Sequence, residues 1–444
     1  MTARFDPSGP LRGSLRPPPD KSVSHRAALI AAMGEGETAI ENYLDAADTR
    51  STLVAVQELG AGVLHAEPGV FDRGLRVRGV GLRNAGAGTV ANGKAQPLDI
   101  DVGNAGTLLR LLPGWLAGQE TGTWRLDGDE SIRRRPVDRI AEPLALMGAQ
   151  IACRDGRLTP VTIEAAPLHG IEYELPVASA QVKSCLLFAG LLAEGETRIV
   201  EPLASRDHSE RMLSAAGAEI ERAGSAISVR PAKRLEPGEI VVPADFSSAA
   251  FLLVAALLVP GSEVELEGVG LNPTRTGLLA VLERMGAEIE IEDEAERGGE
   301  PSGRLRVRAS RLKGTDIGGA EVPLAIDELP LVALAACFAE GETTIHEAAE
   351  LRRKESDRIA TVSEALTALG AEVETSEDGM AIVGQGALRG GSIESHGDHR
   401  IAMLGAIAGL ASRDGVEVDG MDAAAVSYPR FEADVAALCG AGHE

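Results

Sequence analysis

The chain has 444 residues, of which 44% are hydrophobic and only 3% aromatic, and its 43 basic and 67 acidic residues give a net charge of −24. A nucleic-acid-binding protein needs a basic face and usually aromatic platforms for base stacking, so this composition argues against a nucleic-acid partner. The chain is too long for one ordinary core, so we expect two domains. An acidic exterior still allows a small anionic ligand if basic residues gather at one site.

The N-terminal segment MTARFDPSGPLRG lacks the apolar core of a signal peptide, and the longest apolar run, residues 249–260, is too short to span a bilayer. The four cysteines show no metal-ligand spacing. We therefore expect a reduced, cytoplasmic protein that has no structural metal and does not associate with a membrane.

Two sequence patterns alternate along the whole chain. In the first, an apolar helix leads through a Gly-x-Thr/Ser-type turn into a short strand, at 26–40, 108–126, 184–200, 249–267, 331–346 and 401–418. In the second, an amphipathic helix closes on a glycine, often before a strand, at 56–63, 144–151, 213–220, 282–289, 366–373 and, more weakly, 436–442. Such recurrence, here every roughly 65–85 residues, predicts six copies of one α/β unit.

Six units divide into three plus three. We expect residues 21–242 to form one domain, and residues 1–20 with 243–444 to form the other. We place the boundary between the domains in VVPAD at 241–245. The RPPP stretch at 16–19 is expected to be a second linker between the domains, and a stiff one because proline fixes φ. Segments 81–97 and 291–303 lack periodicity and are predicted to be loops or hairpin tips.

Charged and small polar residues gather at or near helix starts. The motifs are DKSVSHR (20–26), DVGNAGTLLR (101–110), GDESIRRRPVDR (128–139), PVASAQVKS (176–184), LAIDELP (324–330), LRRKESDRIA (351–360) and HGDHRIAM (396–403). Each has an ordinary structural explanation, such as a helix cap, a helix-start turn or a solvated charged face. Each also suits an anion, because a helix N-terminus offers free N–H groups and positive partial charge.

The motifs differ in the chemistry they could support. Three adjacent arginines end at Arg135, before a proline that could begin a helix. Asp327 could be a cap or a general base. Lys354 and Arg358 would share a helix face if their stretch is helical, and a bound anion would relieve their repulsion. The histidines near Asp398 could suggest a metal, but Arg400 beside them favours an anion. Because most of these motifs precede the first helix of successive units, they predict one shared anion-binding cleft.

In this order the seven motifs resemble the 5-enolpyruvylshikimate-3-phosphate synthase family, also called 3-phosphoshikimate 1-carboxyvinyltransferases, over residues 15–430. SAQ, SRDH and KESDR resemble its more divergent second branch. The resemblance implies a two-domain, inside-out α/β barrel in which each domain has three β-α-β-α-β-β units and the domains close over the substrates. It also implies a step of aromatic amino-acid biosynthesis, transfer of the enolpyruvyl group of phosphoenolpyruvate to the 5-hydroxyl of shikimate 3-phosphate, without metal or organic cofactor. We expect a monomer.

The resemblance also implies roles for particular residues. It places shikimate 3-phosphate on the side of domain 21–242. The residues that it implies for binding this substrate are Lys21, Ser22, Arg26, Ser179, Ala180, Gln181, Arg206, Asp327 and Lys354. For phosphoenolpyruvate, over which the other domain closes, it implies Lys21, Asn104, Gly106, Arg135, Gln181, Arg358, His399 and Arg400. It makes Asp327 the base for the attacking hydroxyl and Glu355 the proton donor and acceptor at the methylene carbon, with Lys21 also catalytic. The two substrates together bring roughly five to six negative charges, which seven of these cations would balance.

Two positions set this chain apart within the family. Val426, in VSYP, stands where the better-known branch has a lysine, so one phosphate contact is missing or supplied from elsewhere. Gly106 stands where some members carry alanine, a change linked to glyphosate tolerance, so we expect a glyphosate-sensitive enzyme. We further expect Asp327→Ala to abolish most turnover and Arg358→Ala mainly to weaken phosphoenolpyruvate binding.

Two other functions remain open. UDP-N-acetylglucosamine enolpyruvyltransferases share the architecture and donor but usually carry a reactive cysteine before an Arg-Pro pair, where this chain has DESIRRRP. A non-catalytic anion-binding scaffold could use the same repeats. Retention of both Asp327 and Glu355 beside the cations argues against it, because simple anion binding would favour losing those carboxylates.

Overall fold

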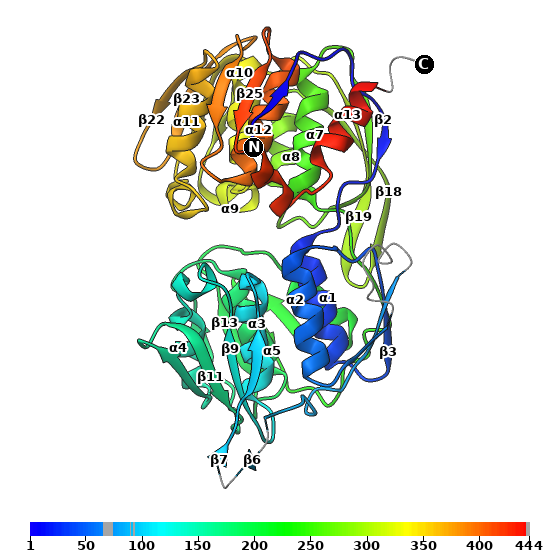
Figure 1. The fold of residues 1–444 in the computed structure, drawn as a ribbon, viewed down its shortest axis with the longest axis vertical. Helices are drawn as coiled ribbons and strands as arrows, with labels where there is room; N and C mark the ends of the chain where they lie inside the picture. The colour runs from blue at the N-terminus through cyan, green and yellow to red at the C-terminus, as the bar shows by residue number, and fades with distance from the viewer. Residues whose placement is uncertain (65–73, 89, 92–93, 441–444) are drawn as a thin grey trace. The chain divides into compact units, whose positions relative to one another are not determined.

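The computed structural model describes residues 1–64, 74–88, 90–91 and 94–440. The chain divides into two compact units (Figure 1), which we name by where most of their residues lie. The C-terminal unit comprises Met1–Pro18, Ala244–Ala295 and Pro301–Glu444, and the N-terminal unit comprises Pro19–Pro243 and Glu296–Glu300. The chain thus changes unit beside prolines at two places. The chain also enters and leaves the N-terminal unit at Glu296–Glu300. The sequence had predicted that this short segment belongs to the other domain.

The central helices of the two units are apolar almost all round, which is the pattern of a fully buried helix. In the N-terminal unit they are α1 (Lys21–Met33), α3 (Gly106–Ala117) and α5 (Ala180–Gly190). In the C-terminal unit they are α7 (Phe246–Leu258), α10 (Leu329–Phe338) and α12 (His399–Ala411). Every residue of α7 is buried, and α7 lies against α12 (Figure 1).

The other helices bury only part of their surface. They are α2 (Ala47–Glu58), α4 (Asp138–Leu146), α6 (His208–Ala215), α8 (Gly277–Arg284), α9 (Val322–Ala325), α11 (Arg358–Ala368) and α13 (Phe431–Gly440). Short 3-10 turns lie at η2 (Ile132–Arg134), η3 (Gly319–Glu321), η4 (Ala349–Arg353) and η5 (Met421–Val426). No helix of the described residues is long and apolar enough to cross a membrane.

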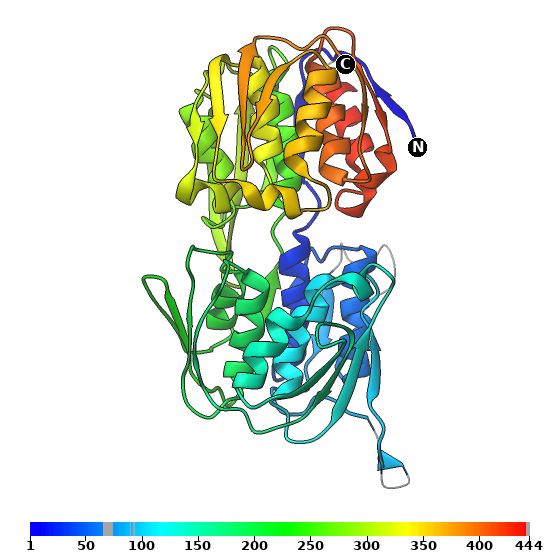
Figure 2. The same ribbon diagram turned by 90° about the vertical axis from the view of Figure 1, so that its left-hand side faces the viewer.

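Three mixed sheets surround the central helices of the N-terminal unit (Figure 2), and in each a parallel pair of strands is extended by antiparallel ones. The first sheet contains β16 (Glu239–Val241), β3 (Glu37–Glu41), β5 (Leu75–Arg78) and β4 (Gly62–Leu64). The second contains β10 (Gln150–Arg154), β11 (Leu158–Glu164), β9 (Thr123–Asp127) and β8 (Leu98–Asp101). The third contains β12 (Glu172–Glu174), β13 (Thr197–Val200), β15 (Ala226–Val229) and β14 (Ile220–Ala223).

The C-terminal unit has three sheets with the same kind of parallel pair. The first contains β18 (Glu288–Arg297), β19 (Glu300–Arg308), β17 (Glu263–Gly270) and β2 (Arg12–Leu15). The second contains β20 (Asp316–Ile317), β21 (Glu340–Ile345), β23 (Met380–Gln385) and β22 (Glu372–Thr375). The third contains β1 (Ala3–Phe5), β25 (Val416–Asp419) and β24 (Gly391–Glu394). The two N-terminal strands therefore complete sheets of the unit formed mainly by the C-terminal half.

The segment 291–303, which was predicted to be a loop or a hairpin tip, forms the end of a β-hairpin. Strands β18 and β19 fill this segment except for Gly298 and Gly299, which have φ of 61° and 86° and form a tight turn. Between 292 and 303 the strands carry little apolar alternation, so they escaped detection. Cross-strand ion pairs link β18 and β19 here, as between Arg304 and Asp293, 2.9 Å apart.

The other predicted loop, 81–97, lies partly outside the described residues, which omit 89 and 92–93. Its described part contains the two-stranded pair β6 (Val90–Ala91) and β7 (Lys94–Ala95). The last residues of the predicted repeat at 436–442 also lie outside the described chain.

Burial of His25 should make stability depend on pH. Its side chain is 1% exposed and bonded to Thr52, and burial lowers its pKa from 6.5 to about 3. Between these values the unfolded chain binds a proton that the folded chain does not, so stability is fully present above pH 6.5 and is lost as pH falls. As pH falls from 6.5 to 5, His25→Asn should reduce the slope of unfolding free energy against pH by an amount that rises from about 0.7 to about 1.3 kcal/mol per unit.

Urea denaturation at several pH values measures this slope. His346→Asn is the control, because His346 is solvent-exposed and hydrogen bonding to Asp316 raises its pKa, so its contribution has the opposite sign. An unchanged slope in His25→Asn would show that His25 is not the group responsible.

Candidate active site

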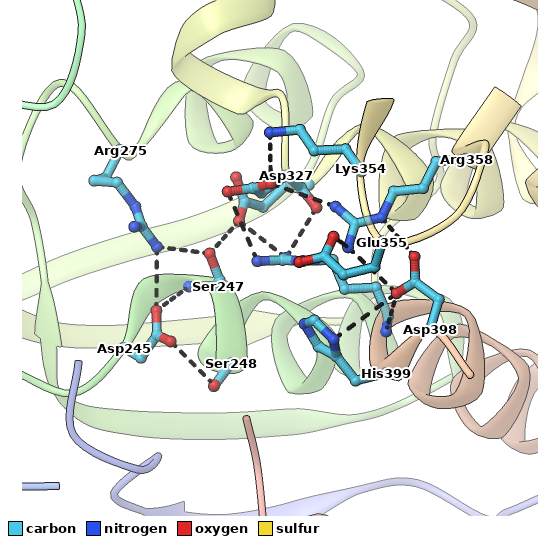
Figure 3. A network of polar contacts seen from close by, with 12 residues as sticks. Asp245, Ser247, Ser248, Arg275, Asp327, Lys354, Glu355, Arg358, Asp398 and His399 are labelled. Carbon is cyan, nitrogen blue, oxygen red and sulfur yellow. Dashed lines mark hydrogen bonds and ion pairs between the residues drawn. The ribbon is translucent and has the colours of Figure 1, made fainter. Parts of the chain in front are cut away.

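In the C-terminal unit, the starts of α7, α10 and α12 carry one connected polar network (Figure 3). Asp245 caps α7 by accepting from Ser247 N, and Asp398 caps α12 by accepting from Arg400 N. Glu328 occupies the cap position of α10 but makes no capping bond. Its carboxylate instead accepts a hydrogen bond from the Ser247 hydroxyl, which joins α10 to α7. The network therefore ties the three buried helices together at one end.

Asp327 lies just before α10 and is surrounded by cations. Its carboxylate is 3.4 Å from Lys354 Nζ, 3.4 Å from Arg358 Nη1 and 3.8 Å from Arg400 Nη2. The backbone carbonyl of Asp327 also accepts from Arg400 Nη1 at 2.9 Å. The structure thus brings the predicted base together with three of the predicted anion-binding residues.

Arg358 is the most deeply buried of these cations, with 1% of its side chain exposed. Its Nε donates to Asp398 Oδ2 at 2.9 Å, and its Nη2 donates to Glu355 at 2.7 Å. The segment before it is not one helix, because η4 ends at Arg353 and α11 begins only at Arg358. Lys354 and Arg358 therefore do not share a helix face, yet both reach Asp327.

Two titratable side chains beside Arg358 have shifted pKa values. Burial of Glu355 raises its pKa, but Arg358 and other neighbouring positive charges outweigh this effect, and the pKa lies below the usual range. Burial, followed by the charge of Arg400, lowers the pKa of His399 to about 4. At neutral pH Glu355 is therefore a carboxylate and His399 a neutral imidazole.

Sequence reasoning missed one member of this network, Arg275, and considered a second, Glu328, only as a possible cap or general base in the LAIDELP motif. Arg275, which is 6% exposed, donates to Asp245 at 3.2 Å and to Ser247 at 2.6 Å. Burial raises the pKa of Glu328, although Arg400, 3.4 Å away, opposes that shift. Arg275 lies in NPTRTG, a polar segment directly before α8, and this helix start was not among the motifs singled out in the sequence.

In the N-terminal unit, Asp20 caps α1 by accepting from Val23 N, as its place before the helix predicted. Lys21 Nζ lies 3.2 Å from Asp48, and the Ser22 carbonyl accepts from Arg26. Arg26 is 2% exposed.

Arg26 is a buried cation surrounded by hydroxyls. It donates to Ser209 Oγ at 2.8 Å and to Ser184 Oγ at 3.0 Å. In the part of the chain that the structure describes, no carboxylate lies within ion-pair distance of it. Burial lowers the pKa of Arg26 to about 10, and the positive charge of Arg206 contributes to the shift. The charges of Asp20, Glu210 and Glu300 oppose the shift from beyond ion-pair distance, so a bound anion would be the direct countercharge of Arg26.

The starts of α3 and α5 also meet. Gln181 Nε2 donates to Thr107 Oγ1 at 3.3 Å, Ser179 caps α5 by accepting from Val182 N, and the Ala180 carbonyl accepts from Ser184. These contacts place the predicted residues 179–181 beside the glycine-rich turn.

Arg135 reaches the same turn. It donates to Asn104 Oδ1 at 3.0 Å, and a Cβ on Gly106 would lie 2.9 Å from Arg135 Nη1 and 3.0 Å from Arg110 Nη1. The proline after Arg135 does not begin a helix: α4 starts only at Asp138. The absence of a side chain at Gly106 therefore lets two guanidinium groups approach the start of α3.

Val426, the last residue of η5, has a side chain that is 57% exposed and carries no charge. Among the described residues, no three His, Cys, Asp or Glu side chains cluster in a way that could hold a metal ion.

Comparison with known proteins identifies this arrangement. The fold is shared with the enolpyruvyl transferase NikO from Streptomyces tendae, with a TM-score of 0.76 at 18% identity over 98% of this chain and 96% of that one. The profile of the family described as EPSP synthase (3-phosphoshikimate 1-carboxyvinyltransferase) matches residues 5–435. The chain therefore belongs to the EPSP synthase family.

Individual relatives are similar along their whole length. The 3-phosphoshikimate 1-carboxyvinyltransferase of Thermus thermophilus is 49% identical, with 99% of both chains covered. That of Alkalilimnicola ehrlichii is 48% identical, over 97% of this chain and 94% of its own. A solved EPSP synthase from Acinetobacter baumannii has a TM-score of 0.89 at 41% identity, covering 98% of this chain and 97% of that one.

The burial of Arg358 generates a stability prediction. Arg358→Ala leaves Asp398, which is fully buried, without its cation, so the variant should lose about 3–5 kcal/mol of unfolding free energy. Arg133→Ala removes an exposed pair with Asp127 and should lose less than about 1 kcal/mol. Equal losses in urea denaturation would refute the role given to burial. Binding of phosphoenolpyruvate should therefore be measured only on folded Arg358→Ala.

Proposed function

We propose that this protein transfers the enolpyruvyl group of phosphoenolpyruvate to the 5-hydroxyl of shikimate 3-phosphate and releases phosphate. The observation that carries the proposal is the setting of Asp327, a carboxylate held by three cations beside a second carboxylate, Glu355. Anion binding alone does not need two carboxylates among the cations. Membership of the EPSP synthase family supports the same reaction.

The two substrates divide the residues between them. Shikimate 3-phosphate is bound by Lys21, Ser22, Arg26, Ser179, Ala180, Gln181, Arg206, Asp327 and Lys354. Phosphoenolpyruvate is bound by Lys21, Asn104, Gly106, Arg135, Gln181, Arg358, His399 and Arg400. The buried Arg26, which has no carboxylate partner in the described chain, supports a phosphate beside it.

The reaction proceeds by addition and elimination. Asp327 takes the proton of the 5-hydroxyl while the hydroxyl oxygen bonds to C2 of phosphoenolpyruvate. A proton is added to the C3 methylene at the same time. The resulting tetrahedral adduct then loses that proton from C3 and phosphate from C2, which restores the double bond. The departing phosphate takes up the proton held by Asp327, which regenerates the carboxylate. The cations offset the charges of the two substrates throughout.

Glu355 is the group that supplies and recovers the proton at C3. Arg358 holds its pKa low in the structure without substrates. An anion bound beside Arg358 competes for that positive charge, so the pKa of Glu355 rises and the carboxyl can carry a proton. His399, neutral because of burial, adds no charge of its own.

We also infer that the six sheets derive from one β-α-β-α-β-β unit and form two inside-out barrels. The parallel pair present in every one of these sheets supports this inference. An experimental structure in which one sheet lacked that pair would contradict it.

Phosphate release tests the reaction directly. With phosphoenolpyruvate as donor, we expect release with shikimate 3-phosphate and none with UDP-N-acetylglucosamine. Release only with the second acceptor would assign the chain to the other enolpyruvyl transfer, and release with neither would leave an anion-binding scaffold.

The base is tested by Asp327→Asn, which keeps the shape and removes the charge. It should lower kcat by about 10²- to 10⁴-fold, the range of general-base catalysis, with little change in the Kd of shikimate 3-phosphate measured by calorimetry. Glu374→Gln, an exposed change on β22 of the same unit, should leave kcat unchanged. Normal turnover in Asp327→Asn would remove this residue from the role of base.

Glyphosate sensitivity tests the donor side. We expect the protein to be inhibited when phosphoenolpyruvate is scarce. A methyl group at Gly106 forces Arg135 or Arg110 to move, so Gly106→Ala should raise the inhibitory glyphosate concentration at least about tenfold and also raise the KM for phosphoenolpyruvate. Gly9→Ala, where nothing lies within 4 Å of the new methyl, should change neither. Undiminished wild-type turnover in millimolar glyphosate at low phosphoenolpyruvate would contradict the expectation.

A further inference from the structure

A buried lysine with no role in the proposed reaction lies next to the acceptor residues. Lys183, on α5, has no exposed side-chain surface. Its Nζ lies 2.8 Å from Glu210 Oε1, 3.0 Å from Glu201 Oε2 and 3.2 Å from the Ser205 carbonyl oxygen. These three partners match the three N–H donors of an ammonium group.

Glu201 also hydrogen-bonds to Ser205. Its Oε2 accepts from the Ser205 backbone N–H at 3.2 Å and also from the Ser205 hydroxyl. Ser205 is therefore held at its N–H, its hydroxyl and its carbonyl by two buried, oppositely charged groups. Few loop residues are fixed at all three positions, because loops usually leave such groups to water.

The charges of this cluster balance. Arg222 Nη2 lies 3.0 Å from Glu201 and 3.1 Å from Glu210, so two cations face two carboxylates. Arg222 is 37% exposed and makes no contact with Ser205, whereas Lys183 does. The two cations thus have the same carboxylate partners but differ in whether they touch the loop.

The residue directly after Ser205 is Arg206. Its positive charge contributes to lowering the pKa of Arg26, which shows that the two cations lie within electrostatic range. Lys183 and Ser184 are neighbours on α5, and Ser184 bonds Arg26. One turn of α5 therefore holds both Arg26 and the loop that carries Arg206.

We propose that Lys183 is a positioning residue that acts with Glu201 to clamp Ser205, and through it sets the place of Arg206 for the anionic acceptor substrate. This inference rests on the proposed function, in which Arg206 binds shikimate 3-phosphate. Two cations whose separation is fixed in advance bind a phosphate without first ordering a loop, which is why the clamp increases affinity.

The test compares two variants that remove one positive charge from the same cluster. Lys183→Met should raise the KM for shikimate 3-phosphate about tenfold or more and leave the KM for phosphoenolpyruvate within about twofold. Arg222→Met should leave both within about twofold, although both variants lose stability. Thermal melting establishes that each variant is folded.

A double-mutant cycle distinguishes a lysine that positions Arg206 from one that only stabilises the fold. If Lys183 acts through Arg206, Lys183→Met should have no further effect on the acceptor KM in an Arg206→Ala background. Additive effects, or equal KM values in Lys183→Met and Arg222→Met, would overturn the proposal.

If Lys183→Met does not fold, Glu201→Gln takes its place in both comparisons, because it weakens the bonds to Ser205 while keeping the side-chain shape. An Arg206→Ala enzyme with unchanged acceptor KM would instead remove Arg206 from the acceptor site, and the proposed role of Lys183 with it. Enolpyruvyl transfer by the wild-type chain would be unaffected by that result, so the two failures are distinguishable.

Discussion

The buried ion pair between Arg358 and Asp398 is the interaction on which the C-terminal half of the candidate site depends. Asp398 caps α12, accepts from Ser356 and holds the guanidinium of Arg358, all with no exposed side-chain surface. Arg358 in turn orients Glu355 and reaches Asp327. A buried pair of this kind contributes little net stability compared with apolar packing, but loss of one partner is costly. Its value here is that it holds one guanidinium in contact with both Glu355 and Asp327.

Each unit buries an arginine, and the groups that surround the two arginines differ. In the C-terminal unit, carboxylates surround Arg358, whereas in the N-terminal unit hydroxyls and a carbonyl surround Arg26. Hydroxyls satisfy the N–H donors without neutralising the charge, so Arg26 keeps its positive potential for a ligand. Arg358 is offset by three carboxylates, and its charge lowers the pKa of one of them, Glu355.

Much of this organisation can be predicted from the sequence, because helix periodicity, capping residues and closing glycines are local signals. Asp20, Ser179 and Asp398 cap helices where the motifs indicate helix starts. The misses have a common physical origin. Toward its tip the β18–β19 hairpin is linked by cross-strand ion pairs instead of an apolar stripe, as between Arg304 and Asp293, and Arg275 and Lys183 are polar residues whose partners lie far along the chain. Nothing local distinguishes such a residue from a solvated one.

The pairing of β1 and β2 has a consequence for how the chain reaches its folded state. Ala3–Phe5 pair with Val416–Val418, and Arg12–Leu15 pair with Glu263–Leu266, so β1 and β2 are synthesised hundreds of residues before their partners. The N-terminal unit has its own closing strand, since β16 pairs with β3 within that unit. The order of synthesis therefore lets the N-terminal unit close first, while β2 stays unpaired until β17 is made and β1 until the last sheet of the C-terminal unit is complete.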